Sequence, residues 1–234
     1  MKKTKSKMLF LVERDDWQKD SALNHVLLKH LKRTKQQIIW EDPAGNLIYK
    51  LRCFENKNMW IPLTLKKLNL RILQTWYVIF HWSYFKYLTN RDSRNKDSKD
   101  LSTIEIRKKI LKQRISNYDK NYELFIISRS AGGRFASSVA DELNIKHIIC
   151  LSYPFQNPNN GVEPDRYVHL ENLKTPMTIF QGDKDEYGGL EVIDKYKLSK
   201  NINLQFVNAN HDFNISHKEW NKVLTQIDTI IKTV

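Results

Sequence analysis

The sequence is poor in cysteine and has no long run of hydrophobic residues. Its only two cysteines, Cys53 and Cys150, exclude a scaffold held by several disulfides and indicate a reducing compartment. The chain opens with the basic segment M-K-K-T-K-S-K, but the apolar run behind it, Met8 to Val12, is too short for the hydrophobic part of a signal peptide. We therefore expect no export and a cytoplasmic protein.

Motifs that bind metals or nucleotides are also missing. No histidine lies at a metal-ligand spacing from a second histidine or a cysteine. Neither G-x-x-x-x-G-K-S/T nor G-x-G-x-x-G occurs. We therefore expect no metal and no cofactor.

Positive charge is abundant. The chain has 39 Lys and Arg residues against 26 Asp and Glu residues, a formal net charge of +13. The lysines are spread over predicted helix faces, which favours compositional bias over a designed patch. A basic surface still concentrates anionic ligands, so contact with acidic lipid or nucleic acid stays open. No zinc-finger spacing or aromatic RNA-binding motif supports a specific nucleic-acid site.

The length fits one globular domain. A chain of 234 residues can build a single large α/β core, and short apolar strand patterns alternate with helical patterns along it. No internal repeat or long low-complexity linker interrupts the chain. We predict one α/β domain over residues 1–234.

The stretch L-F-I-I-S-R-S-A-G-G-R-F, which begins at Leu124, combines a strand, a sharp turn and the start of a helix. Leu124 to Ile127 are apolar, as expected for a strand buried on both faces of a parallel sheet. The turn falls at Ser130, whose hydroxyl would be lifted above the sheet edge while the next helix points its N–H groups at the same place. That helix has one buried face, formed by Phe135, Val139 and Leu143.

Small residues flank this corner, where strand and helix must approach closely. The positions two before and two after Ser130 are Ser128 and Gly132. The pattern is S-x-S-x-G, where the nucleophile elbow of hydrolases reads G-x-S-x-G. Ser130 is therefore a candidate nucleophile. The assignment requires a partner acid and a histidine elsewhere in the chain.

Both partners follow in the chain. The strand pattern Pro176 to Gln181 leads into a turn that carries Asp185, and the pattern Leu204 to Val207 leads into a loop that carries His211. Each of the three residues lies just past the carboxyl end of a predicted strand. The order Ser130, Asp185, His211 is that of a hydrolase triad.

These motifs resemble the α/β-hydrolase superfamily, and within it the small single-domain enzymes similar to dienelactone hydrolases. L-S-Y-P-F from Leu151 and F-Q-G-D-K-D-E-Y-G from Phe180 match the run between the elbow and the acid turn. The resemblance covers the chain from about Asn121 to its end, and the first hundred residues only loosely. It implies a mostly parallel central sheet with helices on both faces.

The resemblance also implies the roles of the three residues. Ser130 would be the nucleophile, His211 the general base and acid, and Asp185 the residue that fixes the imidazole tautomer. Asp183 is the nearest competitor for the acid, and Asp212 is a more remote one.

By the same resemblance, backbone N–H groups would form an oxyanion hole. One donor would come from Ala131 and the other from the loop E-R-D-D-W around Arg14, where the family often has His and Gly. Losing one such donor costs on the order of 3 kcal/mol of barrier. Arg14 is either a clamp for a substrate carboxylate or phosphate, or part of a solvated loop with local ion pairs. Arg129 is a second candidate for contact with substrate.

The region from Asn46 to Asn90 is harder to interpret. L-I-Y-K-L-R-C predicts a strand, and Thr64 to Leu88 predicts one long helix rich in aromatic residues. Charged residues interrupt this helix, so we do not expect it to span a membrane. Its aromatic stripe packs in a core, forms a cap or pocket wall over Ser130, or docks on lipid. Residues 60–100 would be an aromatic insertion or cap that ends in a charged loop.

Together these features predict a serine hydrolase that cleaves a carboxylic ester or thioester through an acyl-enzyme. The aromatic helix favours a partly apolar substrate and the basic charge favours an anionic one. The alternative is a catalytically inactive α/β-hydrolase fold that serves as a binding or scaffold protein with a basic surface. A third possibility is a peripheral membrane or nucleic-acid-associated protein. The oligomeric state stays open.

Overall fold

A computed structural model describes residues 5–12, 21–34, 36–85, 88, 101–160 and 163–233. The chain divides into two compact units. We call Met1–Ile39 with Leu111–Val234 the sheet unit, and Trp40–Ile110 the hairpin unit. The expectation of a single domain with an insertion around residues 60–100 stays a prediction.

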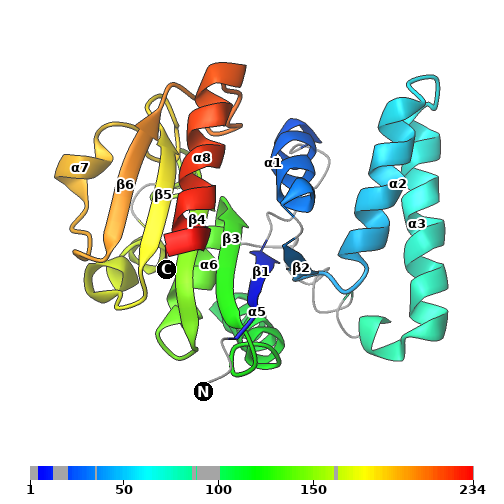
Figure 1. The fold of residues 1–234 in the computed structure, drawn as a ribbon, viewed down its shortest axis with the longest axis horizontal. Coiled ribbons are helices and arrows are strands. Elements are labelled where there is room, and N and C mark those ends of the chain that lie inside the picture. Colours follow the sequence, from blue (N-terminus) through cyan, green and yellow to red (C-terminus); the bar gives the residue numbers. More distant parts are fainter. Residues whose placement is uncertain are drawn as a thin grey trace. The chain divides into compact units, whose positions relative to one another are not determined.

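The sheet unit is built on a six-stranded sheet with the order β2-β1-β3-β4-β5-β6 (Figure 1). Four neighbouring pairs, from β1–β3 to β5–β6, are parallel, which confirms the predicted α/β fold with a mostly parallel sheet. The strand order reverses between β1 and β3, and open α/β sheets bind ligands at the carboxyl ends of strands at such a point. The strands are β1 (Lys7–Val12), β2 (Gln37–Trp40), β3 (Glu123–Arg129), β4 (Ile145–Leu151), β5 (Met177–Gly182) and β6 (Ile202–Val207).

Helices cover both faces of this sheet, which is why its strands read as nearly continuous apolar runs. All six residues of β5 are buried, and so are the last six of β3. Helix α6 packs on β3 and β4, while α1 and α8 contact each other and lie over the opposite face (Figure 1). The helices are α1 (Ser21–Arg33), α5 (Leu101–Ser116), α6 (Ala131–Ala140), α7 (Val192–Lys195), α8 (His217–Thr233) and the 3-10 turns η2 (Pro164–Arg166) and η3 (Val168–Asn172).

The hairpin unit contains two helices that pack side by side, α2 (Gly45–Lys57) and α3 (Leu63–Phe80) (Figure 1). Its small core is formed by Ala44, Ile48 and Tyr84. Five partly buried residues pack against this core: Leu70, Leu73, Tyr77, Val78 and Leu88. No described helix combines the length and the apolar character that a membrane crossing requires.

Two sequence-based predictions in the hairpin unit are wrong. The strand predicted for L-I-Y-K-L-R-C lies inside α2. A helix starts there because Asp42 begins a turn: its carboxylate accepts the Ala44 N–H at 2.8 Å and its carbonyl accepts the Gly45 N–H at 2.9 Å. The helix predicted for Thr64 to Leu88 ends at Phe80, since the chain turns at His81 so that Tyr84 enters the core.

Candidate active site

Ser130 lies at the sharp corner between β3 and α6. Its φ of 49° and ψ of −124° are unusual for a residue with a side chain, and such a conformation costs on the order of 1–3 kcal/mol. The corner is held by two backbone hydrogen bonds, from the Ser130 N–H to the Leu151 carbonyl at 3.1 Å and from the Gly133 N–H to the Ser130 carbonyl at 2.8 Å. The surrounding structure therefore imposes the strained conformation that presents the serine above the sheet edge.

Close packing behind the corner requires small residues. A Cβ atom at Gly133 would collide with the sulfur of Cys150 on β4, so the first turn of α6 can approach the sheet only with glycine there. The hydroxyl of Ser128 donates to the Ile149 carbonyl at 3.1 Å. The sequence pattern pointed to Gly132 as the tight position, whereas the collision lies at Gly133.

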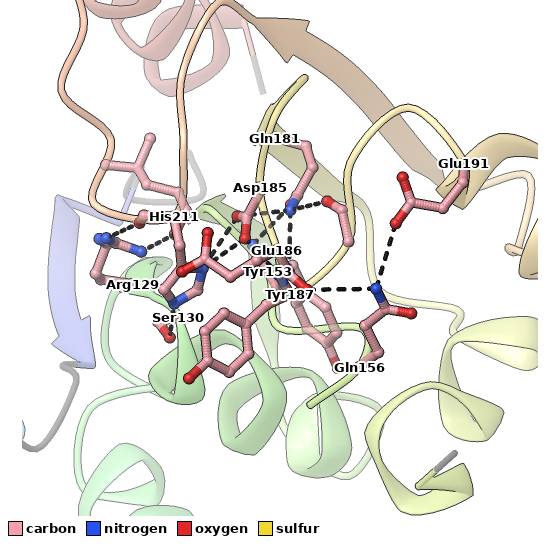
Figure 2. A network of polar contacts seen from close by, with 12 residues as sticks. Arg129, Ser130, Tyr153, Gln156, Gln181, Asp185, Glu186, Tyr187, Glu191 and His211 are labelled. Carbon is pink, nitrogen blue, oxygen red and sulfur yellow. Dashed lines mark hydrogen bonds and ion pairs between the residues drawn. The ribbon is translucent and has the colours of Figure 1, made fainter. Parts of the chain in front are cut away.

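The three residues predicted as a triad come together at the carboxyl ends of β3, β5 and β6 (Figure 2). Ser130 Oγ lies 2.8 Å from His211 Nε2. His211 Nδ1 lies 2.9 Å from Asp185 Oδ1 and 3.0 Å from Oδ2. With a proton on Nδ1, His211 donates to Asp185, and Nε2 accepts the hydrogen of the Ser130 hydroxyl. All three residues are buried.

Neither competing acid takes the place of Asp185. The carboxylate of Asp183 accepts the Ala209 N–H at 3.0 Å, which ties the loop after β5 to the loop after β6. The side chain of Asp212 is exposed. Gly182 allows the loop after β5 to lie against the loop after β6, because a Cβ atom at this position would collide with the Ala209 carbonyl. The two loops can thus come close enough for Asp185 to reach His211.

Gln181, which sequence reasoning missed, holds the carboxylate of Asp185 (Figure 2). Its fully buried amide donates to Asp185 Oδ2 at 2.9 Å and to the Gly188 carbonyl at 2.6 Å, and its oxygen accepts the Tyr153 N–H at 2.8 Å. The Tyr187 N–H donates to Asp185 Oδ1 at 2.8 Å. The only sequence signal was an amide side chain inside an otherwise apolar strand directly before the acid turn.

Arg129 supports the site from the backbone side. Its side chain is buried, and its guanidinium donates to the carbonyls of His211 and, at 3.4 Å, Leu151. These contacts favour a role in positioning the His211 loop. The predicted contact of Arg129 with substrate stays a prediction.

An aromatic ring packs against the imidazole of His211. The rings of Tyr187 and His211 have centroids 4.2 Å apart and an interplanar angle of 35°. This contact limits the rotation of the imidazole, so its two nitrogens keep facing Ser130 and Asp185 (Figure 2).

Of the two predicted oxyanion donors, the structure describes one. Ala131 is the first residue of α6, so its N–H belongs to the positive end of that helix. Arg14 and its neighbour Glu13 lie outside the described residues, and the roles predicted for this loop stay predictions.

The thiol below the elbow does not compete with the serine. Complete burial raises the pKa of Cys150 to about 12. The thiol therefore stays protonated at neutral pH, and Ser130 is the group at this corner that faces a base.

Comparison with known proteins agrees with the fold. The sequence model of the alpha/beta hydrolase domain family matches residues 60–234. No curated protein sequence matches the chain.

Among solved structures, a metagenome-derived lipolytic enzyme is 11% identical with a TM-score of 0.55, over 99% of this chain and 96% of that one. A protein of the alpha/beta superfamily from Xanthomonas campestris pv. campestris is 9% identical with a TM-score of 0.54, over 96% and 98% of the two chains. An esterase from Pyrococcus furiosus is 15% identical with a TM-score of 0.46, over 57% of this chain. The chain spans 62% of that esterase's length. Identities this low show a shared fold alone.

Proposed function

Because the chain belongs to the α/β-hydrolase family, we propose that it is a serine hydrolase that cleaves a carboxylic ester or thioester. The observation that carries the proposal is the continuous hydrogen-bonded path from Ser130 Oγ through His211 to Asp185, with the serine in a strained backbone conformation. Backbone strain alone does not mark a nucleophile, since buried Ser152 also has a positive φ of 52°. The imidazole of His211 at hydrogen-bond distance is what singles out Ser130.

Acylation would begin at Ser130. As Oγ attacks the carbonyl carbon, His211 Nε2 takes its proton, and the carbonyl oxygen becomes an oxyanion that accepts the Ala131 N–H. The intermediate collapses, the bond to the leaving oxygen or sulfur breaks, and His211 returns its proton to the departing alcohol or thiol. The product is an acyl-enzyme on Ser130.

Deacylation would use the same groups in reverse. His211 takes a proton from water, the hydroxide oxygen attacks the acyl carbon, and the second intermediate expels Ser130 Oγ, which regains a proton from His211. Asp185 holds the imidazolium in both half-reactions. The scheme needs no metal or cofactor.

The substrate class follows from composition and surface. The net charge of +13 attracts anionic molecules toward the protein, and the aromatic-rich composition of the chain, 11% Phe, Trp and Tyr, is compatible with partly apolar ones. We propose a small ester or thioester with one of these characters. The likeness to dienelactone hydrolases and the second oxyanion donor near Arg14 belong to the proposal.

The test is turnover of an aromatic ester and of a thioester by the purified chain. Ser130→Ala should lower the rate by about 10⁴-fold or more. The matched control is Ser137→Ala, since Ser137 on α6 is also buried and its Oγ lies 2.8 Å from another imidazole, that of His169. This control should keep the wild-type rate. Absence of turnover in the folded wild type would favour the inactive binding or scaffold protein.

A further inference from the structure

Helix α3 of the hairpin unit is exposed along one apolar side. None of its residues is buried. Leu70, Leu73 and Tyr77 face the small core of the unit. Surface helices normally turn polar residues outward, but the exposed side of α3 carries six large apolar residues with exposures of 39% to 71%: Leu65, Leu68, Ile72, Trp76, Ile79 and Phe80.

These six residues form one continuous stripe, which we call the α3 face. At 3.6 residues per turn they fall within an arc of about 120° around the helix axis. Residues at both ends of α3 extend the apolar character, since Trp60 is 77% exposed and Trp82 is 68% exposed. Trp60, Trp76 and Trp82 are half of the six tryptophans of the chain.

The border of the α3 face is positively charged. The side chains of Lys66 and Arg71 flank the stripe on the same helix, one on each side at 3.6 residues per turn, and α3 contains no acidic residue. Exposed Lys50 and Lys57 of α2 add to the positive charge of the unit.

The acidic residues between positions 40 and 85 do not balance this charge at the surface. Glu41, Asp42 and Glu55 are all at least nine-tenths buried. Each is engaged inside the unit: Glu41 with Arg107, Asp42 with the Ala44 N–H, and Glu55 with Arg52 and Asn69. The exposed surface between positions 40 and 85 therefore combines apolar side chains with cations and carries no carboxylate.

A second copy of the chain is a poor occupant for this face. Pairing two such faces would bring Lys66 and Arg71 of one copy near the same cations of the other, in a protein with a net charge of +13. An anionic lipid surface fits all the features. Apolar side chains enter the boundary between headgroups and acyl chains, tryptophans lie at the headgroup level, and lysine and arginine face lipid phosphates.

We propose that the α3 face docks the protein on the surface of a membrane that contains anionic lipids, with α3 lying in the interface. The helix of 18 residues would cover about 27 Å along the membrane plane. The proposal does not depend on the proposed esterase activity.

The test uses the full chain and sedimentation with vesicles of phosphatidylcholine, with and without phosphatidylglycerol. The wild type should sediment with the anionic vesicles, less so at high salt, and little with phosphatidylcholine alone. Lys66→Glu with Arg71→Glu should weaken binding by at least about thirtyfold, and Ile72→Ser with Trp76→Ser should abolish it. The matched control is Lys200→Glu with Lys218→Glu, a reversal of two exposed lysines of the sheet unit, which should leave most of the binding.

Three outcomes would overturn the proposal. The first is no sedimentation of the wild type with either vesicle. The second is an equal loss of binding in both charge-reversal variants, which would indicate attraction by net charge alone. The third is a dimer, seen by analytical ultracentrifugation without vesicles, that Ile72→Ser with Trp76→Ser dissociates, which would make the α3 face a self-association surface.

Discussion

The sheet unit and the hairpin unit differ in what they bury and what they expose. The sheet unit encloses Ser130, Asp185 and His211 in a hydrogen-bonded path inside an apolar core. The hairpin unit buries Glu41, Asp42 and Glu55 and leaves Ile72 and Trp76 exposed. A buried hydrogen-bonded path holds its side chains in one geometry, and removing one member leaves another buried polar group without a partner, which destabilises the fold. An exposed apolar face destabilises the free protein little and favours contact with another apolar surface. Substitutions should therefore act on chemistry in the first unit and on association in the second.

The largest expected effect comes from Asp185→Asn. The variant should lower kcat by about 10⁴-fold, because an asparagine in this place favours the imidazole tautomer in which Nε2 carries the proton and cannot accept one from Ser130. Steady-state kinetics on the ester would measure it. Asp183→Asn is the matched control, since Asp183 contacts the Ala209 N–H and lies outside the triad. Equal losses in both variants would contradict the assignment of Asp185.

Gln181→Met should come next. The substitution removes the amide that donates to Asp185 and to the Gly188 carbonyl, so each of these buried acceptors loses one hydrogen bond. An unsatisfied buried group lowers the free energy of unfolding by about 1–3 kcal/mol. We expect urea unfolding to show a loss of about 2–4 kcal/mol, with a lower kcat and a nearly unchanged KM. Gln226→Met on the exposed side of α8 should change neither property. A stable, fully active Gln181→Met variant would show that Tyr187 alone orients the acid.

Acid should weaken the sheet unit through His147. Burial lowers the pKa of His147 to about 4 from an ordinary value of 6.5. Between these two values the unfolded chain binds a proton that the folded chain does not, so the free energy of unfolding falls as the pH drops from 6.5 toward 4. His147→Gln should lose less stability than the wild type between neutral pH and pH of about 5 in denaturant titrations. The exposed His217→Gln serves as control, and an unchanged pH dependence in His147→Gln would refute the prediction.

The smallest effect on stability is expected at the α3 face. Ile72 is 58% exposed and Ile48 is 2% exposed. Ile72→Ser should change the free energy of unfolding by less than about 0.5 kcal/mol, while Ile48→Ser should cost about 2–5 kcal/mol. Denaturant unfolding of both variants would sharpen the contrast between the two sides of the hairpin unit. A large loss in Ile72→Ser would mean that the folded chain itself covers the face.

The sequence predicted the sheet unit far better than the hairpin unit. In the sheet unit the strands before Ser130, Asp185 and His211 contain short, mainly apolar stretches, each followed by a turn or loop, so their ends could be placed from local patterns. The hairpin unit lacks such a simple pattern, because α3 is apolar both on the side that packs in the core and on the exposed side. The periodicity of apolar residues therefore could not distinguish its buried side from its exposed side. The break at His81 depends on where Tyr84 packs, which no local pattern encodes.

Within the site, the residues that support the triad escaped prediction. Gln181 lies in a stretch that resembles the family, but its role depends on contacts with Tyr153 and Gly188 that form only when the chain is folded. Gly133 is required by the sulfur of Cys150 on a neighbouring strand. Such requirements appear only when the strands are assembled.

The most direct test of the central claim is labelling with a fluorophosphonate followed by intact-mass measurement and peptide mapping. Only an activated serine reacts with this probe at an appreciable rate. We predict a single adduct on Ser130 of the wild type, an adduct of the same mass in Ser137→Ala, and none in Ser130→Ala or His211→Ala. A folded wild type without an adduct, or an adduct that persists in Ser130→Ala, would contradict the account of Ser130 as an activated nucleophile.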